Sequence, residues 1–319
     1  MQLPTLPVIS LAAHPDTASL AVELGRACRE EGFIYLSDHG IPAELTDEAF
    51  GISERYFADA RPEDKVDLKE NTGYTAVRQE SLDPSRASGD LKECFHFANS
   101  DWQEAHGKPQ KLPSSLEPDR PTIDRFIHEI NRVAARILHG LAVALRLPED
   151  YLVKQHRGEH NRLRLLHYPP AALSRNDSSP DIRAGAHTDY GSITLLFQHR
   201  VSGLQVRRGD DWMDVPPRSG CLVINIGDAL EFWSGGRFKS TLHRVVMPRE
   251  QAETSSRYSI AYFVHPDTDS ILDPFVDEHN AELLDQLLVR KGLPRGTRRI
   301  RGNDYVQARL QATYAVKAN

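Results

Sequence analysis

The sequence predicts an α+β fold in which a helix-rich N-terminal part packs on an antiparallel β-barrel or β-sandwich. Up to about residue 160, apolar residues recur at the spacing of amphipathic helices. Beyond it they alternate with a period of two, in short runs separated by turn sequences such as PPRSG and SGG. The 319 residues are 39% hydrophobic and 26% charged, which is typical of a globular protein and argues against a disordered or fibrous one.

The N-terminal part contains three expected helices and three short strands. Leu20, Leu24 and Ala27 mark one face of the first helix, which Gly32 ends. A long amphipathic helix is indicated by five apolar residues on one face, Phe126, Ile130, Val133, Ile137 and Leu141. The expected elements are strands over 7–10, 33–36 and 94–98, helices over 17–31, 42–58 and 122–145, and a helical turn over 150–155.

The C-terminal part contains seven short strand candidates at nearly even spacing, which favours a barrel or sandwich. They cover residues 162–168, 192–198, 203–207, 212–215, 221–226, 242–247 and 257–265. Two helical stretches, 280–288 and 303–314, follow around a basic linker that we interpret as a solvated loop.

Charge and cysteine content exclude several classes of protein. The 39 Lys and Arg residues against 45 Asp and Glu residues give a net charge of −6, which does not favour a nucleic-acid partner. No basic segment followed by an apolar one resembles a secretory signal, and no apolar run approaches the roughly 18 residues of a membrane span. Cys28, Cys94 and Cys221 lie far apart, so neither a disulfide framework nor a zinc knuckle is expected. We therefore expect a cytoplasmic protein.

Among 14 histidines, His187 and His243 stand out by their sequence surroundings. His187 and Asp189 lie two residues apart before a strand, so an extended backbone aims both side chains at one point. His243 opens another strand candidate, after the SGG turn. Two histidines and one carboxylate bind one face of a metal and leave three positions open, which suits non-haem Fe(II) oxygenases. Zinc would more often take four protein ligands, or three and a water.

A second pair points to an acidic ligand. Arg257 and Ser259 share one strand face with Ala261 and Phe263, so the guanidinium is expected to point into the barrel. A buried guanidinium needs an anionic partner, and its fork matches a carboxylate. The Ser259 hydroxyl adds a further donor.

These motifs resemble the isopenicillin N synthase-like family of Fe(II)/2-oxoglutarate-dependent oxygenases. The resemblance rests on HTDYGSITLLFQ, on GLQVRRGDDWMDVPPRSGCLVINIGDALEFWSGGRFKSTLHRVV, on RYSIAYFVHP, on LRLLHYPP and on VISL followed by GFIYLSDHGIP. It extends from about residue 5 to residue 315. It implies a distorted double-stranded β-helix, or jelly roll, with flanking N-terminal and C-terminal helices. One domain over 1–319 is then expected, with a helical and loop region over 5–120, the jelly-roll core over 160–267 and C-terminal helices over 280–315.

The resemblance also implies the chemistry. His187, Asp189 and His243 would bind Fe(II), and the protein would use 2-oxoglutarate and O₂ to oxidise, most often to hydroxylate, a C–H bond of a small-molecule substrate, with release of succinate and CO₂. Arg257 and Ser259 would bind the distal carboxylate of 2-oxoglutarate. The implied hydrogen bond from Tyr168 completes this set, although many relatives carry Asn where this chain has Leu166.

Five residues are candidates for contact with the primary substrate. Phe263 matches an aromatic residue that lines the pocket in relatives. Phe95 and His96 lie in a segment that the family places near the pocket, with edge-strand packing as the alternative. Tyr74 and Arg78 lie in NTGYTAVRQE, where a solvated loop is the alternative.

Two other functions remain open from the sequence. One is a non-haem iron oxidase of the same family that does not use 2-oxoglutarate. The other is a non-catalytic jelly-roll protein that binds a metal or a small acid. We expect a monomer, with a homodimer as the alternative, and neither a nucleic-acid nor a membrane partner.

Overall fold

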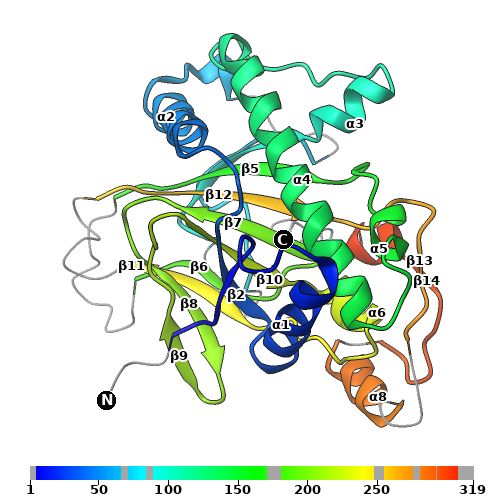
Figure 1. The fold of residues 1–319 in the computed structure, drawn as a ribbon. Helices are drawn as coiled ribbons and strands as arrows, with labels where there is room; N and C mark the ends of the chain where they lie inside the picture. The colour runs from blue at the N-terminus through cyan, green and yellow to red at the C-terminus, as the bar shows by residue number, and fades with distance from the viewer. Residues whose placement is uncertain are drawn as a thin grey trace.

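Two β-sheets face each other, and helices cover the outer face of the larger sheet (Figure 1). The protein is represented by a computed structural model that describes residues 5–65, 71–83, 89–170, 181–247, 255–275, 281–291 and 293–307. This arrangement is the jelly-roll core with flanking helices that the sequence predicted.

The larger sheet has eight strands in the order β1-β2-β10-β7-β12-β5-β4-β3, and its neighbours are antiparallel except for the parallel pair β1–β2. Its strands are β1 (Val8–Ser10), β2 (Phe33–Ser37), β3 (Gly73–Thr75), β4 (Glu93–Ala98), β5 (Arg162–Tyr168), β7 (Ile193–Gln198), β10 (Cys221–Ile226) and β12 (Arg257–Val264).

The smaller sheet has the order β6-β11-β8-β9 and is antiparallel throughout. Its strands are β6 (Asp181–His187), β8 (Leu204–Arg208), β9 (Asp211–Asp214) and β11 (His243–Met247). A separate two-stranded ribbon pairs β13 (Ile271–Leu272) with β14 (Ile300–Arg301).

The long helix α4 (Arg120–Ala144) packs against α1 (Thr17–Glu30) and α2 (Ala43–Asp59) on the outer side of the larger sheet (Figure 1). The shorter helices are η1 (Pro62–Asp64), α3 (Ser100–Ala105), η2 (Glu117–Asp119), α5 (Tyr151–Lys154), α6 (Asp228–Trp233) and α8 (Ala281–Arg290). Residues 302–307 are also helical. In the described part of the chain, no helix combines the length and apolar composition of a membrane span.

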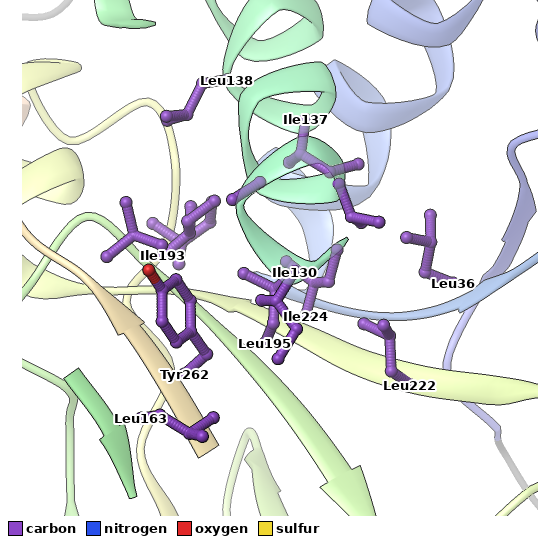
Figure 2. Close-up of a cluster of buried hydrophobic side chains, with 14 of the residues drawn as sticks. Leu36, Ile130, Ile137, Leu138, Leu163, Ile193, Leu195, Leu222, Ile224 and Tyr262 are labelled. Atoms are coloured by element: carbon purple, nitrogen blue, oxygen red, sulfur yellow. The ribbon is translucent and has the colours of Figure 1, made fainter. Parts of the chain in front are cut away.

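Strand alternation divides the interior into two parts. On β5 and β12, Leu163, Leu165 and Tyr262 point to the helices and join the large core around Ile130 and Ile137 of α4 (Figure 2). The alternate positions point between the two sheets, because successive side chains of a strand face opposite sides. The inward residues are Arg162, Arg164, Leu166 and Tyr168 of β5 and Arg257, Ser259, Ala261 and Phe263 of β12.

The prediction of the fold from the sequence was incomplete in two respects. The N-terminal part contributes four strands to the larger sheet, so it extends the β core as well as covering it. Strand β6 and helix α6 were not expected, because DIRAGAH and DALEFW are too short or too poor in β-branched residues for a clear period. The rest of the expected helix over 303–314 lies outside the described residues beyond 307.

Candidate active site

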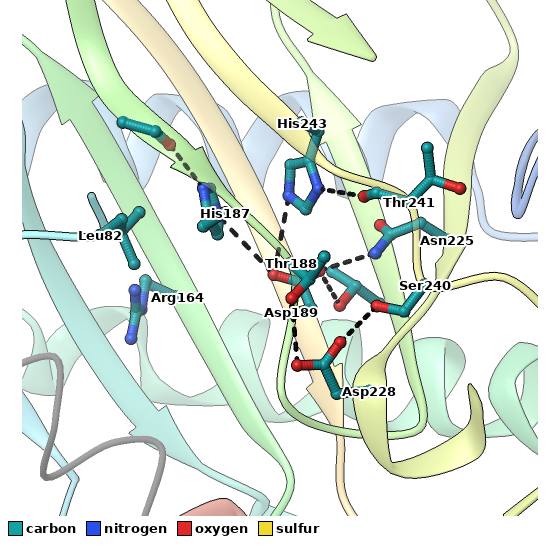
Figure 3. Close-up of polar contacts among 12 residues, drawn as sticks. Leu82, Arg164, His187, Thr188, Asp189, Asn225, Asp228, Ser240, Thr241 and His243 are labelled. Atoms are coloured by element: carbon teal, nitrogen blue, oxygen red, sulfur yellow. Dashed lines mark hydrogen bonds and ion pairs between the residues drawn. The ribbon is translucent and has the colours of Figure 1, made fainter. Parts of the chain in front are cut away.

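Two neighbouring strands and one turn bring His187, Asp189 and His243 together. His187 ends β6, His243 begins β11, and the two residues are directly opposite in the antiparallel register. Asp189 lies in the turn after β6. Its Oδ1 lies 3.8 Å from Nε2 of His187 and 3.7 Å from Nε2 of His243 (Figure 3). The three side chains therefore place one candidate ligand atom each within 4.8 Å of the others.

The second nitrogen of each histidine contacts a backbone carbonyl. Nδ1 of His187 lies 2.7 Å from the oxygen of Gly185, and Nδ1 of His243 lies 3.1 Å from that of Thr241. Because a carbonyl can only accept, each Nδ1 must carry the proton and donate. The unprotonated Nε2 atoms are then the ones that face Asp189, and this tautomer is the one a metal ligand needs.

The two oxygens of the Asp189 carboxylate also have different partners. Its Oδ2 accepts hydrogen bonds from Thr194 Oγ1 at 2.6 Å and from Asn225 Nδ2 at 2.7 Å. The other oxygen, Oδ1, therefore faces the two histidines. Burial alone would raise the pKa of Asp189, but the two histidines and these two hydrogen bonds together lower it, so the group is a carboxylate at neutral pH.

Burial and the neighbouring His243 lower the pKa of His187 to about 4, so its imidazole is neutral near pH 7. A neutral imidazole and a carboxylate are the protonation states that bind metals. Within the described residues, no further His, Cys or carboxylate belongs to this group. Two nitrogens and one oxygen on one side of a common point fit Fe(II) better than a closed structural zinc site.

Arg257 lies at another part of the same cavity, on β12. Its side chain is fully buried, Nη2 donates to Gln198 at 3.0 Å, Nη1 donates to Ser259 at 3.3 Å, and the guanidinium lies over the ring of Tyr168 at 4.9 Å. Burial lowers the pKa of Arg257. No carboxylate of the described chain pairs with it, and its Nε has no hydrogen-bond partner there.

The register of β12 against β5 explains this grouping. Arg257 is opposite Tyr168, and Ser259 is opposite Leu166, so all four face the cavity together. A buried cation with unused donors fits a carboxylate ligand, because an isolated charge away from water is costly. Leu166 occupies an inward position, so the place of the Asn of many relatives is an apolar wall here.

A buried cluster of Glu80, Lys92 and Arg164, which we call the charged wall, lines the cavity elsewhere. Lys92 Nζ lies 2.7 Å from Glu80 and 2.8 Å from Asp90, and Arg164 Nη1 lies 3.3 Å from Glu80. The guanidinium of Arg164 also lies over the ring of Phe263, 5.1 Å from its centroid. The charged wall thus carries both signs of charge beside an aromatic ring.

The structure places the five substrate candidates in different environments. Phe263 lines the cavity beside the charged wall. Tyr74 and Phe95 belong to the core under the helices, where Tyr74 donates to Glu93 at 2.5 Å and Phe95 packs on Tyr56. His96 is fully buried beside Thr75 and Cys94, and Arg78 is exposed at a positive φ of 65°. Of these five, all within the described chain, Phe263 alone borders this cavity.

Several site residues were not singled out from the sequence. Thr194 and Asn225 bond to Asp189, and Glu80, Lys92 and Arg164 form the charged wall. A polar residue at an alternate position of an apolar strand is the signal that could have found Thr194 in ITLLFQ and Asn225 in CLVINI. No comparable signal marks Glu80, because residues 76–83 form no strand or helix.

A jelly roll, a His-Asp-His group and a buried arginine with no carboxylate partner among the described residues are together typical of a non-haem iron oxygenase. Residues 159–266 match the 2OG-Fe(II) oxygenase superfamily, and residues 6–116 match the family model described as the N-terminal part of non-haem dioxygenases in morphine synthesis. The chain belongs to the 2OG-Fe(II) oxygenase superfamily. It is a 2-oxoglutarate- and Fe(II)-dependent dioxygenase by family, and this family uses Fe(II), 2-oxoglutarate and O₂.

Individual relatives match most or nearly all of the chain. 1-Aminocyclopropane-1-carboxylate oxidase 1 of Oryza sativa subsp. japonica is 33% identical, over 85% of this chain and 81% of its own. A homoarginine-6-hydroxylase of Glycine max is 30% identical over 84% of both chains. The crystal structure of a full-length Neurospora crassa protein in complex with α-KG and thymine superposes with a TM-score of 0.80 and 29% identity, covering 97% of each chain.

Proposed function

We propose that His187 Nε2, Asp189 Oδ1 and His243 Nε2 bind Fe(II), and that the protein hydroxylates a C–H bond of a small-molecule substrate. The observation that carries this proposal is the division of atoms in the triad. Every other ring nitrogen or carboxylate oxygen of the three residues has a hydrogen-bond partner, and the three remaining atoms face one another. Fe(II) bound there, with 2-oxoglutarate and O₂, supplies the oxidising chemistry.

We assign the binding of the distal carboxylate of 2-oxoglutarate to Arg257, Ser259 and Tyr168. The Arg257 guanidinium offers the fork that a carboxylate accepts, and Gln198 holds its Nη2 at 3.0 Å. Ser259 lies within hydrogen-bond distance of the same guanidinium, and the ring of Tyr168 packs against it. The ligand carboxylate would thereby neutralise a buried cation that has no carboxylate partner within the described chain.

We place the primary substrate against Phe263 and the charged wall. Solved relatives bind small molecules, since the Neurospora crassa structure contains thymine, and the name of the Glycine max relative specifies a hydroxylation. An aromatic face with donors and acceptors beside it suits a small, partly polar molecule. We further propose that residues 1–319 act as one cytoplasmic domain and as a monomer, with no nucleic-acid or membrane partner.

The test is formation of succinate and CO₂ from 2-oxoglutarate by the purified protein with Fe(II), with and without a panel of small molecules. We expect slow succinate formation alone and faster formation when a substrate binds. The matched control is Arg257→Met, which should lose both rates because the co-substrate is no longer held.

Two outcomes would favour the alternatives. Oxidation of a small molecule with Fe(II) and O₂ but without 2-oxoglutarate would indicate a 2-oxoglutarate-independent oxidase, and several relatives are named as oxidases. Tight metal binding without succinate formation or substrate oxidation would indicate a binding protein. Either result would contradict the proposed reaction.

A further inference from the structure

One buried carboxylate, Asp228, is bonded to both chain segments that carry the triad. Its Oδ2 accepts from Thr188 Oγ1 at 3.0 Å, and Thr188 stands between His187 and Asp189. Its Oδ1 accepts from Ser240 Oγ at 2.7 Å, and Ser240 directly precedes Thr241, whose carbonyl orients the third candidate ligand (Figure 3). Asp228 therefore connects the segments 187–189 and 240–243 at the end of the β6–β11 pair where the triad lies.

The backbone of Asp228 strengthens this connection. Its amide donates to the carbonyl oxygen of Asp189 at 2.7 Å. The preceding Gly227 approaches the same turn so closely that a Cβ there would lie 2.2 Å from the carbonyl oxygen of Gly191. The start of helix α6 is thus held directly against the turn that contains the carboxylate of the triad.

The charge of Asp228 is compensated by a residue from a distant part of the chain. Lys291 follows helix α8, and its ammonium contacts Asp228 Oδ1 and lies 3.2 Å from Glu231 and 3.4 Å from Thr188 Oγ1. The side chain of Asp228 is completely buried and that of Lys291 is 11% exposed. Leaving a buried charge without a partner is costly, so the ammonium of Lys291 stabilises the side chain of Asp228 in this position.

Arg290, which directly precedes Lys291, contacts helix α6 from a more exposed position. Arg290 pairs with Glu231 at 2.8 Å, but its side chain is 64% exposed, and among the described residues its ion pair is with Glu231 and not with Asp228. Helices α6 and α8 are in contact, and α8 lies below α6 in the view of Figure 1. Two adjacent basic residues therefore bind the same helix, and one of them reaches the carboxylate behind the triad.

We propose that Lys291 is a positioning residue for the metal site, acting through Asp228. By holding the side chain of Asp228 in place, its ammonium keeps the segments of the triad at the separation that brings the three ligand atoms together. This inference rests on the proposed binding of Fe(II) by the triad. Mutation of a group that is hydrogen-bonded directly to a metal ligand typically changes metal affinity by about 10–100-fold. Lys291 acts one contact further out, through Asp228, so we expect an effect at the lower end of that range.

The experiment is an anaerobic calorimetric titration of the metal-free protein with Fe(II), without 2-oxoglutarate. Lys291→Met should weaken Fe(II) binding by about 10-fold, the lower end of the range for direct partners of metal ligands, and Lys291→Arg should recover most of the affinity because it retains the cation. Arg290→Met is the matched control and should leave the affinity unchanged. In an Asp228→Asn background, Lys291→Met should cause a smaller loss than in the wild type, because residues in one network are not additive.

The inference is overturned if folded Lys291→Met binds Fe(II) as tightly as the wild type, even if its melting temperature is lower. Equal losses for Lys291→Met and Arg290→Met, or an equal loss in the Asp228→Asn background, would also overturn it. If Lys291→Met does not fold, the comparison of Lys291→Gln with Lys291→Arg decides in the same way. Failure of the proposed function itself would look different, since the wild type would not bind Fe(II), or His187→Ala would bind it equally well.

Discussion

The triad and the charged wall line one cavity, but they differ in whether their polar atoms already have partners within the protein. In the triad, Thr194 and Asn225 occupy one oxygen of Asp189 and leave the other facing the histidines. In the charged wall, Lys92 and Glu80 lie 2.7 Å apart and compensate each other. A ligand site can therefore be recognised by the polar atoms that the surrounding residues leave available.

Removing one residue of the triad should cause the greatest loss of Fe(II) affinity and of activity. His187→Ala should reduce Fe(II) affinity by more than the roughly 100-fold reached by changes one contact further out, because it removes a ligand atom. Succinate formation should be lost with it. Fe(II) titration and succinate measurement check both, with His128→Ala as the control, since that ring is 59% exposed and distant from the triad. Retained turnover in His187→Ala would contradict the ligand assignment.

A nearly equal effect, on stability, is expected at the charged wall. Lys92→Met removes the cation between Glu80 and Asp90, and breaking a buried ion pair costs about 3–5 kcal/mol. Lys154→Met is the control, because its pair with Asp150 is exposed and such pairs contribute about 1 kcal/mol or less. Urea unfolding of the metal-free proteins measures the difference. A loss no larger than that of the control would show that the charged wall is not internally compensated.

Replacing Arg257 should weaken the binding of 2-oxoglutarate but should not destabilise the protein without 2-oxoglutarate. Arg257→Met should weaken 2-oxoglutarate binding by about 2–5 kcal/mol, since a buried charge pair loses a partner. Without 2-oxoglutarate the variant should be at least as stable as the wild type, because it removes a buried cation that has no carboxylate partner in the described chain. Thermal unfolding with and without 2-oxoglutarate tests both statements. Equal stabilisation of both proteins by 2-oxoglutarate would refute the role of Arg257.

The smallest effect concerns pH. Burial and the cation Arg162 lower the pKa of His265 to about 3, against about 6.5 in an unfolded chain. Below pH 6.5 the unfolded state therefore binds an additional proton, and stability falls as the pH decreases toward 3. The slope from this one residue is about 1.4 kcal/mol per pH unit. In His265→Gln, metal-free unfolding between pH 6 and pH 4.5 should show a shallower slope by this amount, and an unchanged slope would contradict the neutral buried state.

Much of the β core could be predicted because its signal is local. Strands β5 and β10 begin and end where their alternation indicated, and the helix over 122–145 corresponds to α4. The same alternation placed Arg257, Ser259 and Phe263 on one inward face, which the structure confirms. Strand β6 had no such signal, because its only large apolar residue is Ile182. It is a strand because β11 pairs with it across the sheet.

The positions of Tyr74 and Phe95 show the limit of reasoning from neighbourhood. Tyr74 on β3 and Phe95 on β4 point to the face of the larger sheet that packs under α2. Lys92, directly before β4, points to the opposite face and reaches the cavity. A shift of one residue in register exchanges the two faces of a strand. The register of β4 against β5 is set by long-range packing, so it could not be read from the segment itself.

The types of ligand atom and the strand faces that carry them could be read from the amino-acid sequence, because the period of a strand and the chemistry of His, Asp and Arg are local properties. Only the tertiary structure decided which atom of each ligand remains available and which distant charges support it. Lys291 and Asp228 are 63 residues apart, and their contact exists because α8 packs on α6. Such pairs depend on how separate elements meet, and no local pattern encodes that.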